Sequence, residues 1–303
     1  MRSIAFTSPA QIAVLPKSPI TGSPVPWLTS LYHKSWRGNY GDSRYPGNCS
    51  GELIKDLLLY FRPKSVCDPM TGSGTCRDVC DELDILCAAK DIRFGFDACD
   101  AAQMAALGSF DFVWIHPPYW RMKVYSDDKR DMSTAPTFEY FLHRYRQLIE
   151  NCSKLLNPGG KLAILMGDYS DRTAGFVPLT YWTKRFAFEA HLRQACTDII
   201  RFSHGASSST KVYRSSFIPG LHDTCMVFEP TDRSQPVSEV AVTGAVVARA
   251  NPNPHGVAPD SPTFAMICNL LNRLEVVDPE YYRSELVAEA DDLLADIDGS
   301  RRT

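Results

Sequence analysis

The stretch KSVCDPMTGSGTC, residues 64–76, decides the fold of this chain. Its first half is a short apolar run that predicts a buried strand. Its second half, the Gly-rich turn (residues 68–75), holds two glycines that let the backbone approach a ligand closely. RDVCDELDI, residues 77–85, continues as a helix whose amino end points at the same place. This order of elements is typical of α/β proteins that bind a ligand at the carboxyl ends of parallel strands.

Helices and strands alternate on both sides of this stretch. Helices are expected at residues 51–61 and 137–156, the second closed by the turn NPGG at 157–160. Further short strands are expected at residues 86–91, 110–115, 161–168, 195–202 and 224–230. Each strand is a nearly continuous apolar run, which indicates a mostly parallel sheet covered by helices on both faces. The predicted fold class is therefore α/β.

The segment FDFVWIHPPYW, residues 110–120, leaves the sheet in an unusual way. Two prolines follow the buried strand, and each removes a backbone donor and fixes φ. The chain therefore leaves the sheet in a stiff, extended conformation, with His116 at the lip and Tyr119 just beyond. Trp114 and Trp120 are expected to be packing residues.

Two acids follow the Gly-rich turn at informative distances. Asp91 ends the next strand, 23 residues after Asp68, and an acid at about that distance commonly holds a ribose diol. The alternative for Asp91 is a solvated strand end. Asp97 lies where a carboxylate would accept a hydrogen bond from an adenine amino group. A P-loop is excluded because GxxxxGK[ST] is absent, and Arg77 occupies the third glycine position of a dinucleotide fingerprint.

Composition sets the class of protein. The 303 residues are 44% hydrophobic and 22% charged, as in ordinary soluble domains. No run of about 18 apolar residues predicts a membrane span, and the N-terminus lacks the apolar core of a signal peptide. The ten cysteines are therefore expected to be reduced thiols in a cytoplasmic protein. Cys76, Cys80 and Cys87 are close in sequence, but without a CxxC pair or a nearby His we expect buried thiols and no metal.

Charge separates the chain into a mildly basic body and an acidic tail. Residues 231–303 hold twelve Asp/Glu and six Lys/Arg, a net charge of −6. The whole chain has a net charge of −3, so residues 1–230 carry a net charge of +3. The body can therefore bind a nucleic acid, although its charge does not demand one. The expected parts are an N-terminal arm (1–44), a catalytic domain (45–230), a linker (231–262) and acidic helices (263–303). Those helices form a dimer or partner surface, or fold back on the body, and both alternatives stay open.

DPMTGSGT, FDFVWIHPPYW and LLNPGGKLAILMGD (residues 155–168) together resemble the amino-methylating DNA methyltransferases. These enzymes transfer a methyl group from S-adenosylmethionine to adenine N6 or cytosine N4. The resemblance covers roughly residues 45–228. It implies a Rossmann-like fold with a seven-stranded sheet whose last strand is antiparallel, and HDTCMVFEP (222–230) matches that strand. RYPGNCSGELIKDLL (44–58) matches the segment that helps hold the methionine end of the cofactor.

The resemblance also implies roles for individual residues. The implied cofactor-binding residues are Tyr45, Asp68, Pro69, Thr71, Gly72, Gly74, Thr75, Asp91 and Asp97. The implied catalytic residues are His116, Pro117, Pro118 and Tyr119. A base amino group in a duplex cannot reach the methyl donor, so the nucleotide must flip out. Tyr119 would then stack on the base, while neutral His116 and a carbonyl beside Pro117 would accept its amino hydrogens.

Two departures from the family concern the base and the motif order. The family tetrapeptide usually begins with Asp, Asn or Ser, whereas here it begins with His116. Many relatives with a similar Gly-rich turn also have the two motifs in the opposite order. The base therefore stays open, with adenine favoured over cytosine.

Residues 169–222 are the expected target-recognition region. They interleave basic residues with Tyr, Ser and Thr, a composition suited to phosphate contacts. The basic residues expected to face the nucleic acid are Arg121, Lys123, Lys184, Arg185, Arg201, Lys211 and Arg214. The alternative for this region is an ordinary solvated loop. DNA is the expected partner; the rival functions are an RNA or tRNA methyltransferase and a catalytically silent binding protein.

Overall fold

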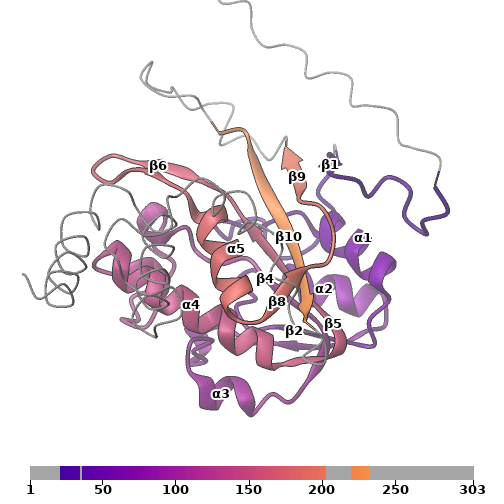
Figure 1. Ribbon diagram of the computed structural model, residues 1–303, viewed down its shortest axis with the longest axis horizontal. Helices are drawn as coiled ribbons and strands as arrows, with labels where there is room; N and C mark the ends of the chain where they lie inside the picture. Colours follow the sequence, from indigo (N-terminus) through magenta and orange to yellow (C-terminus); the bar gives the residue numbers. More distant parts are fainter. Residues whose placement is uncertain (1–20, 35, 203–219, 232–303) are drawn as a thin grey trace, which may run out of the picture. The chain divides into compact units, whose positions relative to one another are not determined.

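The computed structural model describes residues 21–34, 36–202 and 220–231 (Figure 1). The chain divides into two compact units, residues 1–233 and 234–303. The second unit, with most of the expected linker and the acidic helices, lies outside the described residues. So do Lys211 and Arg214. Among the described helices, none has the length and apolar character needed to cross a membrane.

One large sheet runs through the described part of the first unit, in the order β1-β9-β10-β5-β4-β2-β3, with β8 also paired to β10. The strands are β1 (Leu31–Tyr32), β2 (Ser65–Asp68), β3 (Leu86–Ala89), β4 (Phe110–Ile115), β5 (Leu156–Met166), β8 (Leu192–Gln194), β9 (Ile199–Phe202) and β10 (His222–Pro230). The neighbours β2–β3, β2–β4, β4–β5 and β1–β9 are parallel. β10 runs antiparallel to β5, β8 and β9. The expected Rossmann-like α/β fold with an antiparallel closing strand is confirmed.

The large sheet has the predicted seven strand positions, although not all of its strands were predicted. Eight strands form this sheet, but β8 and β9 lie end to end along β10, opposite residues 228–230 and 222–225. They therefore occupy one position in the sheet. The remaining position is filled by β1, which lies within the expected N-terminal arm. Tyr32 of β1 is 1% exposed and donates its hydroxyl hydrogen to Asp56 (2.8 Å), so this part of the arm belongs to the folded body.

Helices cover both faces of the sheet. They are α1 (Gly51–Phe61), α2 (Thr75–Glu82), α3 (Ala101–Ala105), α4 (Phe138–Lys154) and α5 (Leu179–Glu189), with 3-10 turns η1 (Ile92–Phe94), η2 (Trp120–Met122) and η3 (Met132–Thr134). A separate hairpin pairs β6 (Tyr169–Asp171) with β7 (Gly175–Val177). α1 has the predicted bounds. The predicted NPGG turn is instead a bulge within β5, because Phe110 pairs with Leu156 and Phe112 with Lys161.

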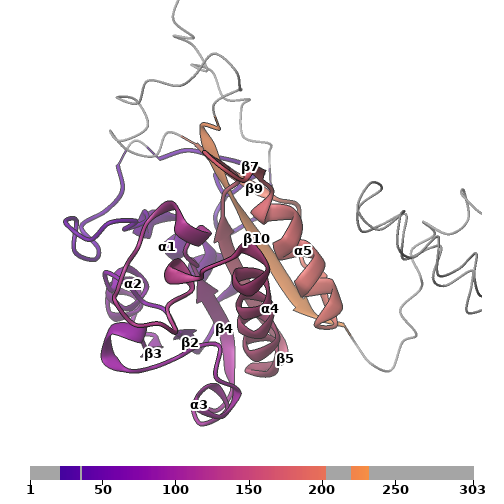
Figure 2. The same cartoon turned by 90° about the vertical axis from the view of Figure 1, so that its left-hand side faces the viewer.

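The two faces follow from the alternation of side chains along each strand. In β5, Leu162, Ile164 and Met166 belong to the core formed with α4 and α5. Ala163 and Leu165 belong to the core formed with α1 and α2. Figure 2 shows α1 and α2 on one side of the sheet and α4 and α5 on the other. The carboxyl ends of β2, β3 and β4 consequently meet at one edge between two helical layers.

Candidate functional site

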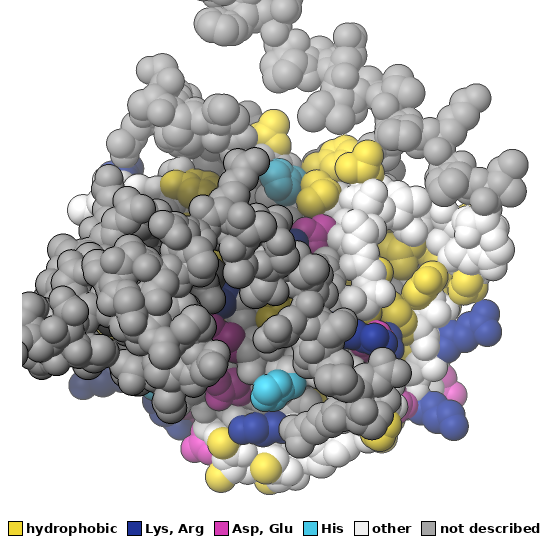
Figure 3. All heavy atoms as spheres, viewed as in Figure 1, with side chains coloured by type: hydrophobic (Ala, Val, Ile, Leu, Met, Phe, Trp, Pro, Cys, Tyr) yellow, Lys and Arg dark blue, Asp and Glu magenta, His cyan; other side chains and the backbone are white. Residues whose placement is uncertain are grey.

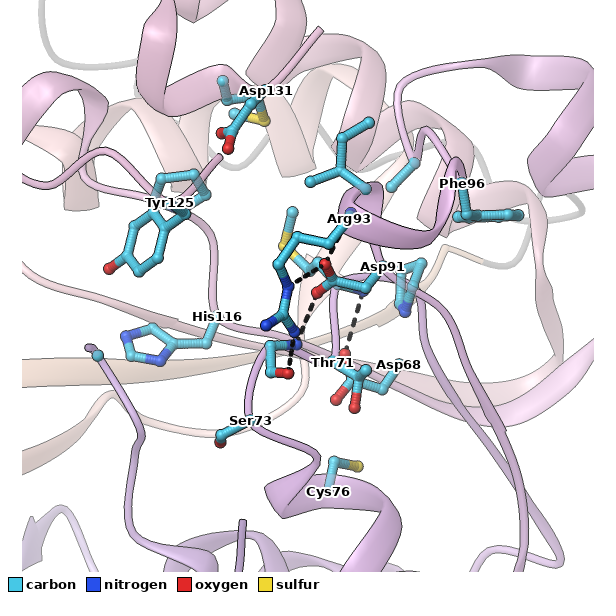
Figure 4. A pocket seen from close by; sticks show the side chains of 18 of the residues that line it. Asp68, Thr71, Ser73, Cys76, Asp91, Arg93, Phe96, His116, Tyr125 and Asp131 are labelled. Atoms are coloured by element: carbon cyan, nitrogen blue, oxygen red, sulfur yellow. Dashed lines mark hydrogen bonds and ion pairs between the residues drawn. The ribbon is translucent and has the colours of Figure 1, made fainter. Parts of the chain in front are cut away.

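A pocket lies at this edge of the sheet (Figure 4). It is lined by ten of the residues predicted from the sequence: Tyr45, Asp68, Pro69, Thr71, Gly72, Thr75, Asp91, Asp97, His116 and Pro118. Gly74, Pro117 and Tyr119 are not among its lining residues. The Gly-rich turn and two residues of HPPY, His116 and Pro118, are more than 40 positions apart in the sequence and line one cavity.

The glycines of the turn are required by backbone conformation and by contact. Gly72 and Gly74 have φ values of +52° and +90°, in the left-handed region that costs other residues about 1–2 kcal/mol. A Cβ on Gly72 would lie 3.0 Å from the Tyr45 ring. Gly74 caps α2 at its amino end. The turn thus packs tightly against Tyr45; that the 44–58 segment holds the methionine end of the cofactor stays a prediction.

Asp91 is buried at the pocket and joins the surrounding backbone through hydrogen bonds, so the alternative interpretation of Asp91 as a solvated strand end is wrong. It is 5% exposed. One carboxylate oxygen accepts the Gly72 N–H (2.8 Å). The other accepts the Arg93 backbone N–H (3.0 Å) and its side-chain Nε–H (2.8 Å). The turn and β3 are joined through this carboxylate.

Arg93 was not predicted, and its side chain reaches across the pocket (Figure 4). Besides pairing with Asp91, its guanidinium donates to the Gly72 carbonyl and lies over the Tyr45 ring at 4.6 Å. A ligand hydroxyl that approaches Asp91 would therefore compete with Arg93. The sequence offered no signal for this contact, because an Arg two residues beyond an acid is common on any loop.

Asp97 lines the pocket but is tied to a helix. Both of its oxygens accept from Arg144 of α4 (2.8 and 2.9 Å), and one also accepts the Cys99 N–H (2.9 Å). The Arg144 and Asp97 side chains are only 13% and 9% exposed. The geometry gives Asp97 a role in fixing the loop before α3, and hydrogen bonding to an adenine amino group stays a prediction.

Two polar side chains at the base of the pocket are buried with few partners. Burial raises the pKa of the Asp68 carboxyl well above its usual range, although Asp68 accepts the Met70 N–H (3.2 Å). The buried Thr71 hydroxyl lies beside Asp68 and makes no hydrogen bond of ordinary geometry with the described residues. A buried polar group without a partner is costly, so this pocket floor suits a ligand with polar atoms.

Loop residues complete the surroundings of the pocket. Asn48, within the 44–58 segment but not in the pocket lining, accepts the Thr75 hydroxyl hydrogen (2.6 Å) and so fixes the start of α2. Tyr125 stacks on Tyr45 with ring centroids 5.8 Å apart. Phe96 and Asp131 also line the pocket. The basic segment RMKVYSDDKR, residues 121–130, was the sequence signal for this wall, and its Tyr125 and Arg130 line the pocket.

Two side chains of the HPPY segment, His116 and Tyr119, contact each other. The Tyr119 hydroxyl lies 3.5 Å from His116 Nε2, and the two rings meet edge to face. The Tyr119 ring packs where a Cβ on Gly167 would come within 3.1 Å, and burial raises the pKa of its phenol. Trp114 and Trp120 are buried, as expected of packing residues. Tyr119 therefore stands beside the pocket, next to His116, in the described conformation.

Most of the predicted basic surface is paired with acids. Arg121 binds Asp171 of the β6–β7 hairpin through two hydrogen bonds (3.1 and 2.7 Å), which hold the pKa of that carboxyl well below its usual range. The other pairs are Lys184 with Asp198 (2.6 Å) and Arg185 with Glu189 (2.9 Å). Lys123 is exposed and has no ion pair among the described residues. On the face in Figure 3 the visible Lys and Arg side chains are scattered.

Arg201 was expected to contact phosphate, and this prediction is wrong. Its side chain is 9% exposed and forms a buried ion pair with Asp223 of β10. The physical reason is its position inside β9, where it pairs directly opposite Asp223 in the antiparallel register. The strand expected at residues 195–202 already contained Arg201, and the ion pair makes this basic residue part of the buried sheet.

No protein-family model and no curated protein matches this chain. Among solved structures, it is similar to a Thermus thermophilus protein provisionally named as a DNA modification methylase, with 20% identity and a TM-score of 0.32 over 47% of this chain and 54% of that chain. TrmN from Thermus thermophilus matches with 18% identity and a TM-score of 0.36, over 61% and 50% of the two chains. This chain thus spans about half the length of these two proteins.

A third solved structure matches almost over its full length. A SAM-dependent methyltransferase from Archaeoglobus fulgidus is 17% identical, with a TM-score of 0.38, over 59% of this chain and 94% of that chain. A further structure of the provisionally named Thermus thermophilus methylase contains bound S-adenosyl-L-methionine.

Proposed function

We propose that this protein is an S-adenosylmethionine-dependent methyltransferase that modifies an exocyclic amino group of a DNA base. Adenine N6 is favoured and cytosine N4 is the other candidate. One observation carries the proposal: the Gly-rich turn with Asp91 and the HPPY residues His116 and Pro118 line the same pocket. A methyl donor held by the first set would therefore lie next to an amino group held by the second.

The residues of the pocket floor fit the donor. The Thr71 hydroxyl needs a partner, the Gly-rich turn leaves room for a close approach, and Asp91 can bind a ribose diol if Arg93 gives way. When bound, S-adenosylmethionine supplies a methyl group on a sulfonium centre. Thr71, Gly72 and Asp91 would hold its polar parts, while Asn48 and Tyr45 contact the Gly-rich turn and keep it in place.

The HPPY residues would bind and orient the base. His116, through its unprotonated ring nitrogen, and a backbone carbonyl beside Pro117 would each accept one hydrogen of the amino group. Two acceptors draw the amino nitrogen towards a tetrahedral shape and turn its lone pair towards the methyl donor. Catalysis then rests on alignment and electrostatics. Tyr119, now edge-on to His116, would turn its face to the flipped base, where stacking contributes roughly 1–3 kcal/mol.

The test is nucleoside mass spectrometry after incubating the purified full chain and S-adenosylmethionine with double-stranded DNA or with RNA. We expect N6-methyladenine in DNA, or N4-methylcytosine as the second base. If RNA is methylated and DNA is not, the protein is an RNA methyltransferase that uses the same chemistry. Cofactor binding by calorimetry without methylation of either substrate would favour the silent binding protein.

A further inference from the structure

Three cysteines converge behind the Gly-rich turn. Cys76 and Cys80 lie one turn apart on α2 and so share a face of that helix. Cys87 lies in β3 and approaches from the sheet. The three sulfur atoms all lie within 4.8 Å of one another. Two separate elements of the fold thus bring soft donor atoms to one point.

The members of this three-cysteine cluster differ in their exposure to solvent. Cys76 and Cys80 are 1% and 0% exposed, whereas Cys87 is half-buried on the edge strand of the sheet. A buried cysteine usually acts as a small apolar residue, which describes a thiol such as Cys152. Among the described residues, Cys76, Cys80 and Cys87 form the group of His, Cys, Asp or Glu side chains whose ligand atoms lie close enough together to bind one metal ion.

The spacing of the sulfurs is close to what one metal ion requires. A thiolate sulfur lies about 2.3 Å from zinc, so three sulfurs around one ion lie roughly 4 Å apart. Small side-chain rotations would bring the cluster from its present separation to that distance. Thiolate ligands select zinc and Cu(I) over harder cations. The half-buried Cys87 provides an entry path for the ion.

We propose that Cys76, Cys80 and Cys87 bind one thiophilic cation, Zn²⁺ or Cu(I), through three thiolates. Each coordinating thiol releases its proton to solvent, so no oxidant or reductant takes part. Three sulfurs complete a trigonal site for Cu(I), while Zn²⁺ would add a fourth ligand such as water from the side of Cys87. The site departs from the sequence expectation of plain buried thiols, which rested on the absence of a CxxC pair and of a nearby His.

The ion would tie together the two elements that form the pocket. Cys76 lines the pocket in the first turn of α2, directly after the Gly-rich turn. Cys87 lies on β3, whose chain continues into Asp91. A bound ion would hold the start of α2 against β3 and so stabilise the folded chain by mass action. This role does not depend on the reaction proposed above.

The experiment is native mass spectrometry of the reduced, metal-stripped full chain, with Zn²⁺ and Cu(I) added in separate arms. We expect one ion per chain in at least one arm, and a rise in melting temperature in that same arm. Cys87→Ser removes the half-buried ligand at the smallest risk to folding. Loss of a group that only orients a metal ligand costs about 10–100-fold in metal affinity, so loss of the ligand Cys87 itself should cost about 100-fold or more. Cys76→Ser and Cys80→Ser should behave alike.

Cys196→Ser is the matched control, because Cys196 is also half-buried but lies outside the cluster. It should keep full metal affinity. The proposal is overturned if neither ion binds at micromolar concentration, if Cys87→Ser binds as tightly as the unchanged chain, or if Cys196→Ser loses as much affinity. A two-dalton mass loss with no bound ion would overturn it in favour of a disulfide. Circular dichroism of each variant separates lost binding from lost folding.

Discussion

The two sides of the pocket differ in how their polar groups are satisfied. On the Gly-rich side, Asp91, Gly72 and Arg93 form a closed set of hydrogen bonds within about 20 residues of sequence. On the other side, His116 and Tyr119 meet at 3.5 Å, and the nearby cation Arg121 is bound to an acid of a separate hairpin. The first side is tied together by hydrogen bonds between the Gly-rich turn and the residues after β3, whereas the cation of the second side is held by an acid 50 residues further along the chain.

The largest expected effect tests the substrate side. His116→Ala should reduce methyl transfer by about 100-fold or more, the usual cost of losing one positioned hydrogen-bonding group in a transition state. Cofactor affinity should stay nearly unchanged. His116→Asn restores an acceptor and should recover part of the rate, measured by single turnover. Full activity in His116→Ala would leave only the rigid Pro-Pro backbone and Tyr119 as the proposed substrate side.

The next effect tests the cofactor side. Asp91→Ala should weaken S-adenosylmethionine binding by about 1.5–3 kcal/mol, because hydrogen bonds to a charged group are lost. Arg93→Ala is the control: it keeps the Asp91 bond to Gly72 and removes the group that competes for the carboxylate. Calorimetry should show equal or tighter cofactor binding for Arg93→Ala. If both variants weakened binding equally, Asp91 would act through its ion pair and the ribose contact would be rejected.

A smaller effect separates contact from backbone strain. Gly72→Ala should lower cofactor affinity by about 10-fold, because a left-handed φ costs about 1–2 kcal/mol and the new Cβ would press on the Tyr45 ring. Gly108 also has a positive φ of 85°, with open space around it. Gly108→Ala should therefore introduce the same backbone strain without a new side-chain contact, and cofactor affinity should stay unchanged. Equal losses in both variants would show that the contact with Tyr45 is unimportant.

The smallest effect concerns the basic residues. Lys123→Gln should reduce the salt dependence of DNA binding by about one unit of slope, as expected of one phosphate contact. Arg121→Gln should change that slope less, since Asp171 already neutralises the guanidinium. Fluorescence anisotropy at several salt concentrations measures both. A larger change for Arg121→Gln would mean that Arg121 leaves Asp171 when DNA binds.

How far the sequence predicted this molecule depended on whether the determining contacts were local. The strand before the Gly-rich turn, the bounds of α1 and the position of the closing strand follow from contiguous apolar patterns, whereas the antiparallel direction of that strand was implied only by the family resemblance. β1 was missed because Leu31–Tyr32 is too short to show a period and lies among prolines and serines. The partners of Asp97 and Arg201 come from segments far away in the chain. No local pattern reveals such pairings, so the ionic contacts of the site could not be predicted.

The position of β10 has a consequence for how the chain folds during synthesis. β10 is the last described strand in sequence, yet it lies between β5 and β9. β1, near the other end of the described chain, pairs with β9. A growing chain that has not yet released residues 222–230 therefore holds a half-sheet of β5, β4, β2 and β3 with an open edge at β5. β1 has no partner strand in the sheet until β9 is held in place by the final strand, although Tyr32 can still contact Asp56 of α1. Such late, long-range pairing slows folding and leaves a strand edge open to other chains. Truncation before residue 222 would thus remove the strand with which β8 and β9 pair, and with it the link between β9 and β5.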